Sequence, residues 1–271
     1  MKPWVVLEKA VGQTPLECLE TYRDTKPELA GIKMAYAGRL DPMASGQLLI
    51  LLGEECKRQQ DYHNLDKEYI FQVLFGTASD TGDVLGLLEM PPEKIDGGEL
   101  ADTRISAVLK DLVGEITLPY PRFSSKTVAG KPLFLRALTK TDTKIDIPNK
   151  TSTIYQLELL ATELAPAETI YRYVTKKIEA ITPVKEVSKE LGADFRREAV
   201  RRDWLAWQKA SLGREYRLAT CRTIVSSGTY MRTLATVIAR RLGTKGLAYS
   251  CLLYTSPSPR DRTRSRMPSS A

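Results

Sequence analysis

One carboxylate in this sequence stands in an unusually constrained setting, within the stretch AGRLDPMASGQLLILLGEECKR, Ala37 to Arg58. Asp41 precedes a proline, which disfavours the helical region for the residue before it, and glycines on either side permit tight turns. Leu40 and Met43 would bury the loop and fix the direction of the carboxylate, which suits a catalytic acid. The alternative is a structural turn aspartate that accepts backbone N–H groups.

A second candidate is SSGTYMRTLA, Ser226 to Ala235. Gly228 and Thr229 fall where a strand passes into a helix, and backbone N–H groups at such a junction can receive a phosphate or a carboxylate. Arg232 lies in the first turn of that helix, where the dipole disfavours a cation, so an anionic partner would explain it. A surface arginine is the alternative.

Two polar segments between these candidates have weaker claims to chemistry. The loop Ser79 to Asp83 lacks the spacing and closing glutamate of a calcium-binding EF-hand, which favours a polar turn between strands. In YPRFSSKTVAGKPLF, neither Ser124 nor Ser125 has a general base within the motif. Basic and aromatic residues in this segment fit phosphate contact and base stacking better, and they are Tyr120, Arg122, Phe123, Lys126 and Lys131.

Composition limits the other chemistry that is available. The chain has 271 residues, is 42% hydrophobic and carries a formal net charge of +7, which suggests a polyanionic partner without proving one. A single histidine, His63, excludes most Ser-His-Asp, Cys-His and multi-histidine metal schemes. The four cysteines form no CxxC pair, so we expect neither a zinc site nor a disulfide framework. With no long apolar span or signal-peptide pattern, we expect a cytoplasmic protein.

The elements that must position these residues mix strands and helices without a regular βαβ rhythm. This pattern favours an α+β fold with a largely antiparallel sheet and flanking helices. Short apolar or alternating runs predict strands at 48–52, 68–75, 155–159 and 216–224. Helical spacing predicts helices at 15–23, 105–112 and 231–238, with the last two stopped by glycines.

A basic helical insertion is predicted at about 166–213. Its central sequence, DFRREAVRRDWLAW, has two interpretations. The simpler is a solvated face with Trp204 and Leu205 packed inward. The other is an insertion that touches RNA.

The last 21 residues, 251–271, differ in kind from the rest, because they show neither helical nor strand periodicity and are rich in Ser, Pro and Arg. Cys251 to Asp261 reverse-translates without mismatch to a transposon-end sequencing adapter, and Ser265 to Ala271 resembles the flow-cell adapter that follows it. We interpret 251–271 as translated adapter, which leaves 1–250 as a C-terminally truncated catalytic domain. Without the tail's four arginines and one aspartate, the net charge would fall from +7 to +4.

Taken together, the ordered motifs resemble the TruB-like tRNA pseudouridine-55 synthase family. The resemblance is carried by VLEKAVGQTP, AGRLDPMASGQLLILLGEECKR, KEYIFQVLFGTASDTGDVLG, YPRFSSKTVAGKPLF, IPNKTSTIYQLELL and SSGTYMRTLATVIARRLG. It implies the pseudouridine synthase catalytic fold and a cofactor-independent isomerisation of uridine to pseudouridine. The implied partner is tRNA, with uridine 55 of the T-loop as the target, and a monomer with no membrane association is expected.

The resemblance also implies roles for individual residues. Asp41 matches the catalytic aspartate, Tyr69 the tyrosine that stacks on the flipped base, and Arg232 the arginine that pairs with the aspartate. Leu234 lies in the same helix motif and is expected to help wall the pocket. Lys131 is assigned to substrate binding with the basic segment that contains it, and no residue is assigned to a metal.

Two positions depart from the family pattern. The Gly-His pair that usually precedes GxLDP is Ala35-Tyr36 here, where the aromatic ring of Tyr36 could still stack on a base. The usual PPxYSAxK reads YPRFSSKT, which shifts the lysine by one place. Two alternatives remain open: a non-catalytic RNA-binding or tRNA-folding protein, and a guide-directed synthase that modifies ribosomal RNA.

Overall fold

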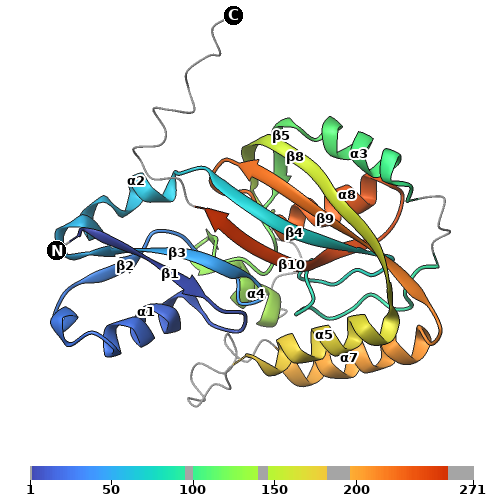
Figure 1. Ribbon diagram of the computed structural model, residues 1–271, viewed down its shortest axis with the longest axis horizontal. Coiled ribbons are helices and arrows are strands. Elements are labelled where there is room, and N and C mark those ends of the chain that lie inside the picture. The colour runs from blue at the N-terminus through green and yellow to red at the C-terminus, as the bar shows by residue number, and fades with distance from the viewer. Residues whose placement is uncertain (1, 95–99, 140–145, 182–195, 256–271) are drawn as a thin grey trace, which may run out of the picture.

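A mixed sheet of eight strands forms the centre of the computed structural model, which describes residues 2–94, 100–139, 146–181 and 196–255 (Figure 1). The strands follow the order β1-β3-β10-β4-β9-β8-β5, and β2 pairs with the end of β3. All pairs are antiparallel except β3 with β10, which confirms the predicted α+β class with a largely antiparallel sheet. The strand bounds are β1 (Trp4–Lys9), β2 (Met34–Tyr36), β3 (Ser45–Leu52), β4 (Lys67–Phe75), β5 (Gly114–Pro119), β8 (Asn149–Pro166), β9 (Glu215–Val225) and β10 (Gly246–Thr255).

Helices flank this sheet. In Figure 1, α1 lies beneath β1 and β2 at one end, whereas α5 and α7 lie side by side at the other. α8 packs against β10 and β4, and α3 packs against β8. The helices are α1 (Pro15–Asp24), α2 (Gln59–His63), α3 (Asp102–Asp111), α4 (Leu133–Thr139), α5 (Ala167–Glu179), α7 (Arg197–Ala210) and α8 (Met231–Arg241), with 3-10 turns η1 (Pro27–Leu29) and η2 (Gly53–Arg58). None of the helices in the described ranges is long and apolar enough to cross a bilayer.

The run LLILL in strand β3 is apolar throughout because both faces of the strand are buried. Leu48, Ile50 and Leu52 pack with residues of α1 and η1, while Leu51 joins a separate cluster with Tyr62 of α2. Because successive side chains alternate across a strand, covering both faces requires a continuous apolar run. The predicted buried strand at 48–52 is therefore confirmed, as are the strands and helices predicted at 15–23, 68–75, 105–112, 155–159, 216–224 and 231–238.

Strand β10 continues from Gly246 through Thr255, so it enters the segment that the sequence assigns to adapter. Cys251 and Leu253 are buried there, and β10 pairs with both β4 and β3. Residues 256–271 lie outside the described part of the chain, and the domain boundary at 250 stays a prediction.

The basic segment at about 166–213 contributes two packed helices, α5 and α7. Residues 182–195 between them are not described, so the prediction of helix there lies outside the structure. Trp204 is fully buried, as the simpler interpretation expects, and its Nε1 donates to the Val84 carbonyl at 2.9 Å. The expectation for Leu205 is wrong, because its side chain is 42% exposed. Trp207, three residues after Trp204 and therefore on the same helix face, is buried instead.

At Gly12 the backbone of another segment lies so close that any side chain would clash with it. Its φ is +90°, and a Cβ built there would lie 2.2 Å from the Ala180 carbonyl oxygen. Gly31 provides a matched control, since its φ is +76° but a Cβ would meet nothing within 4 Å.

We therefore predict that Gly12→Ala lowers the free energy of unfolding by about 3 kcal/mol or more, and Gly31→Ala by only about 1 kcal/mol. Both variants carry the cost of a left-handed backbone, but only the first forces two segments apart. Urea unfolding of the two variants measures the difference, and equal losses would contradict the packing described.

Candidate active site

Asp41 sits in a tight turn that connects β2 to β3. The Ala44 N–H donates to the Asp41 carbonyl at 3.0 Å, and Pro42 occupies the second position of the turn, where its fixed φ is favoured. Leu40, Met43 and Ala44 are all buried, which confirms that apolar neighbours anchor the loop. The Asp41 side chain itself remains 39% exposed, so the turn is fixed while its carboxylate stays accessible.

Two residues that precede the turn in sequence, Lys9 and Gly12, donate hydrogen bonds to its carbonyl groups. The Gly12 N–H donates to the Pro42 carbonyl at 2.8 Å, and Nζ of Lys9 donates to the Ala44 carbonyl at 2.7 Å and to the Gln13 carbonyl at 2.8 Å. Lys9 is only 1% exposed, and burial lowers its pKa to about 8. At neutral pH the Lys9 side chain is therefore a buried cation, and its ammonium group donates hydrogen bonds to backbone carbonyls.

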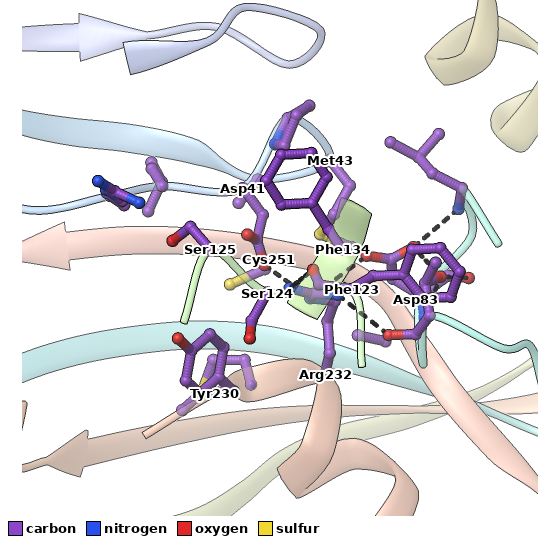
Figure 2. Close-up of a pocket in the computed structure, with 18 of the residues that line it drawn as sticks. Asp41, Met43, Asp83, Phe123, Ser124, Ser125, Phe134, Tyr230, Arg232 and Cys251 are labelled. Atoms are coloured by element: carbon purple, nitrogen blue, oxygen red, sulfur yellow. Dashed lines mark hydrogen bonds and ion pairs between the residues drawn. The ribbon is translucent and has the colours of Figure 1, made fainter. Parts of the chain in front are cut away.

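Arg232 reaches Asp41 from the first turn of α8 (Figure 2). Its Nε donates to Asp41 Oδ2 at 2.7 Å and lies 3.5 Å from Asp83 Oδ2. Burial disfavours the charge of this guanidinium, but the two carboxylates outweigh burial and raise its pKa. The side chain is 7% exposed, so it is no surface arginine, and the two acids explain a cation at this end of a helix.

The same guanidinium also fixes two loops that face Asp41. Nη1 donates to the Thr81 carbonyl at 3.2 Å, and Nη2 donates to the Phe123 carbonyl at 3.4 Å. Arg232 thus joins the Asp41 turn, the polar loop after β4 and the segment before β6 (Thr127–Val128) at one point.

Asp83 is the buried acid of the site. Its Oδ1 accepts from Thr81 Oγ1 at 2.7 Å and from the Leu85 N–H at 2.9 Å. Burial raises the pKa of Asp83, and the charge of Arg232 opposes that rise. Across the described ranges, no cluster of three or more His, Cys, Asp or Glu residues is arranged to hold a metal ion.

A cavity of about 540 Å³ opens in front of Asp41. Tyr69 of β4 lines it, and burial raises the pKa of its phenol, which therefore stays neutral. Tyr36 lies on the lining with Asp41 and Arg232, and these four are the predicted site residues that the cavity brings together. Other lining residues come from distant segments and include Lys67, Phe123, Ser124, Tyr230 and Cys251.

Two predicted site residues lie elsewhere. Leu234 is fully buried in the main core, and its N–H donates to the carbonyl of Tyr230, the N-cap residue that precedes α8. Lys131 is exposed on the short strand β7 (Lys131–Pro132). Neither residue lines the cavity, and their roles in substrate contact stay predictions.

Arg196 is a lining residue that the sequence did not single out. It precedes α7 with φ of +54°, its guanidinium lies 4.4 Å from the Phe123 ring centroid, and it forms two hydrogen bonds with Asp80 at 2.6 and 2.9 Å. A non-glycine residue in the left-handed region at a cavity wall is a mark of functional sites. The sequence shows a run of arginines in the basic segment, but it does not indicate which of these arginines lines the cavity.

Comparison with known proteins identifies the family. The sequence model of the TruB family pseudouridylate synthases, N-terminal domain, matches residues 26–178. The chain belongs to the TruB family. Its sequence is 32% identical over 190 residues to tRNA pseudouridine synthase B of Caldicellulosiruptor saccharolyticus, covering 69% of this chain and 60% of that protein. It is 32% identical over 157 residues to tRNA pseudouridine synthase B of Aquifex aeolicus, covering 58% of this chain and 52% of that one.

Solved structures agree on the fold of this TruB-family chain. A chain in the crystal structure of a Cbf5-Nop10-Gar1 complex superposes with a TM-score of 0.52 at 18% identity, over 93% of this chain and 48% of that one. A chain of an H/ACA RNP bound to a substrate RNA containing 2′-deoxyuridine gives a TM-score of 0.51 at 17% identity, over 93% and 47%. The chain thus spans about half to 60% of the length of these relatives.

Asp83 and Asp80 allow a matched test of the site's electrostatics, because both belong to one loop and both face an arginine. Asp83 and Arg232 are buried, whereas the Asp80 and Arg196 side chains are 36% and 23% exposed. We predict that Asp83→Asn lowers the free energy of unfolding by about 3 kcal/mol, since it removes one partner of a buried pair. Asp80→Asn should lower it by about 1 kcal/mol or less. Urea unfolding measures both, and the reverse ranking would contradict the burial described.

Proposed function

We propose that this chain isomerises uridine to pseudouridine in RNA, at uridine 55 of the tRNA T-loop. Membership of the TruB family supports the reaction class. The observation that carries the proposal is the accessible Asp41 carboxylate, held by Arg232 at the wall of a cavity lined by Tyr69. The proposed setting is a cytoplasmic monomer that acts on tRNA.

The reaction breaks the N1–C1′ glycosidic bond and forms a C5–C1′ bond, while C5 loses a proton and N1 gains one. Atoms balance without an external oxidant or reductant, so the proposal requires no cofactor. Arg232 donates to Oδ2 of Asp41 and so fixes the direction of the carboxylate that would act as the nucleophile. Attack at C1′, attack at C6 and a glycal route are all compatible with this placement.

A uridine stacked in a stem-loop must leave the stack to expose its glycosidic bond. A cavity of about 540 Å³ lies within the usual size of small-ligand pockets, and the faces of Tyr69 and Tyr36 offset part of the lost stacking. The neutral phenol of Tyr69 places no second negative charge beside Asp41. Cationic side chains on the lining, such as Arg39 and Lys67, suit the phosphates that flank the flipped nucleotide.

The experiment is tritium release from tRNA labelled with [5-³H]uridine, with RNA binding measured in parallel. We predict that Asp41→Asn lowers the single-turnover rate by about 10³-fold or more, while Kd for the tRNA stays within about threefold, because asparagine keeps the side-chain shape and an acceptor oxygen for Arg232 but is not a nucleophile. Asp61→Asn on the exposed α2 surface is the matched control and should retain the wild-type rate.

Binding of tRNA by the wild-type chain without tritium release would overturn the catalytic proposal in favour of an RNA-binding or tRNA-folding role. Release from ribosomal RNA only, in the presence of a guide RNA, would overturn the assigned substrate. An Asp41→Asn variant that kept most of its rate would remove Asp41 from the catalytic role.

A further inference from the structure

A second buried cation, Lys177 of α5, lies behind the Asp41 turn. Its side chain is 5% exposed, and Nζ donates to the Tyr249 carbonyl at 3.0 Å and to the Met43 carbonyl at 3.4 Å. Met43 is the residue two places after Asp41 in the tight turn. Lys177 therefore links a helix of the basic segment to the loop that carries the proposed catalytic residue.

The two carbonyls have a physical need for this donor. The pairing of β10 with β4 shifts register between Ala248 and Ser250, so Tyr249 lies at an irregularity of the ladder. Met43 lies at the third position of a β-turn whose own hydrogen bond uses the Asp41 carbonyl. Buried carbonyls of this kind require a partner from outside their own element, and Lys177 serves both at once.

A charged donor is energetically unfavourable at this buried position. Val174 and Ile178 on the same helix are buried beside Lys177, and Nζ lies 4.7 Å from the Tyr173 ring centroid. Burial lowers the pKa of Lys177 to about 8, and the charge of Asp83 opposes that change. Burial of an ammonium group carries a desolvation cost that a neutral donor would not have, so the need for a hydrogen-bond donor alone does not explain a lysine here.

The end of the same helix packs against the other support of the turn. Ala180, which follows α5, lies against Gly12, and the Gly12 N–H donates to the Pro42 carbonyl. With Lys9 on the Ala44 carbonyl, every carbonyl from Asp41 to Ala44 accepts a hydrogen bond. α5 contributes to two of these four supports, one directly and one by packing.

We propose that Lys177 is a positioning residue for the isomerisation, fixing the Met43 carbonyl so that the Asp41 carboxylate keeps its geometry against Arg232. This role rests on the proposed function of Asp41. Asp83 attracts both Lys177 and Arg232, so two buried cations share this buried acid. Small displacements of a reacting group lower rates steeply, which makes such a support consequential.

The test compares Lys177→Met with Lys176→Met on the full chain, by single-turnover tritium release and by thermal unfolding. Methionine keeps the length of the lysine side chain but neither its charge nor its donors, and Lys176 is the exposed neighbour on α5. We expect Lys177→Met to lower the single-turnover rate at saturating tRNA by about tenfold or more. The tRNA concentration that gives half of this rate should change by no more than about twofold. Its melting temperature should stay within about 4 °C of wild type, because lost hydrogen bonds and a lost buried charge offset each other.

Lys177→Gln keeps an amide donor without the charge and should have an intermediate rate. Lys176→Met should match the wild type in rate and in melting temperature. A wild-type rate in Lys177→Met and Lys177→Gln would overturn the positioning role, as would a rate loss that merely followed the loss of folded protein. An inactive wild-type chain would instead overturn the proposed function, so the two failures are distinguishable.

Discussion

The ion pair between Arg232 and Asp41 is the contact on which the site depends. It joins residues 191 positions apart in the sequence, at 2.7 Å, and the same guanidinium holds the carbonyls of Thr81 and Phe123. The sheet order makes this contact possible, because β10 lies between β3 and β4 and α8 packs on β10. The first turn of α8 is thereby brought to the turn that precedes β3.

Three buried cations lie in this pair or behind the Asp41 turn, and the burial of each charge has a desolvation cost. Arg232, Lys9 and Lys177 are all buried, and burial lowers the pKa of each lysine to about 8. Preorganised charges and dipoles of this kind avoid reorganisation when charge develops during a reaction, and they commonly trade against folding stability.

The sequence predicted local structure well where periodicity decides it. Alternation in 216–224 and the apolar run at 48–52 fold as the strands expected, and helical spacing located α8 with Arg232 in its first turn. Leu205 was assigned wrongly because a single apolar residue beside a tryptophan does not fix the buried face. Trp204 and Trp207, three positions apart, do fix it, and Leu205 lies off their face.

The sequence indicated only some of the residues of the candidate site, for a physical reason. Asp41 and Arg232 could be singled out because turn chemistry and the helix dipole made their residue types locally anomalous. Lys9, Lys177 and Arg196 had no such local signal, since an unremarkable lysine or arginine becomes significant only when tertiary packing buries it or turns it into a cavity. Asp83 was visible as an acid of a polar loop, but its burial against Arg232 depends on the fold.

The most direct test of this account is a double-mutant cycle on the free energy of unfolding, with Asp41→Ala, Arg232→Met and the double variant. If the pair organises the site, its coupling energy should be about 1.5 kcal/mol or more, because the contact is close and the guanidinium is buried. Additive effects, with a coupling energy below about 0.5 kcal/mol, would contradict the claim that this contact holds the site together.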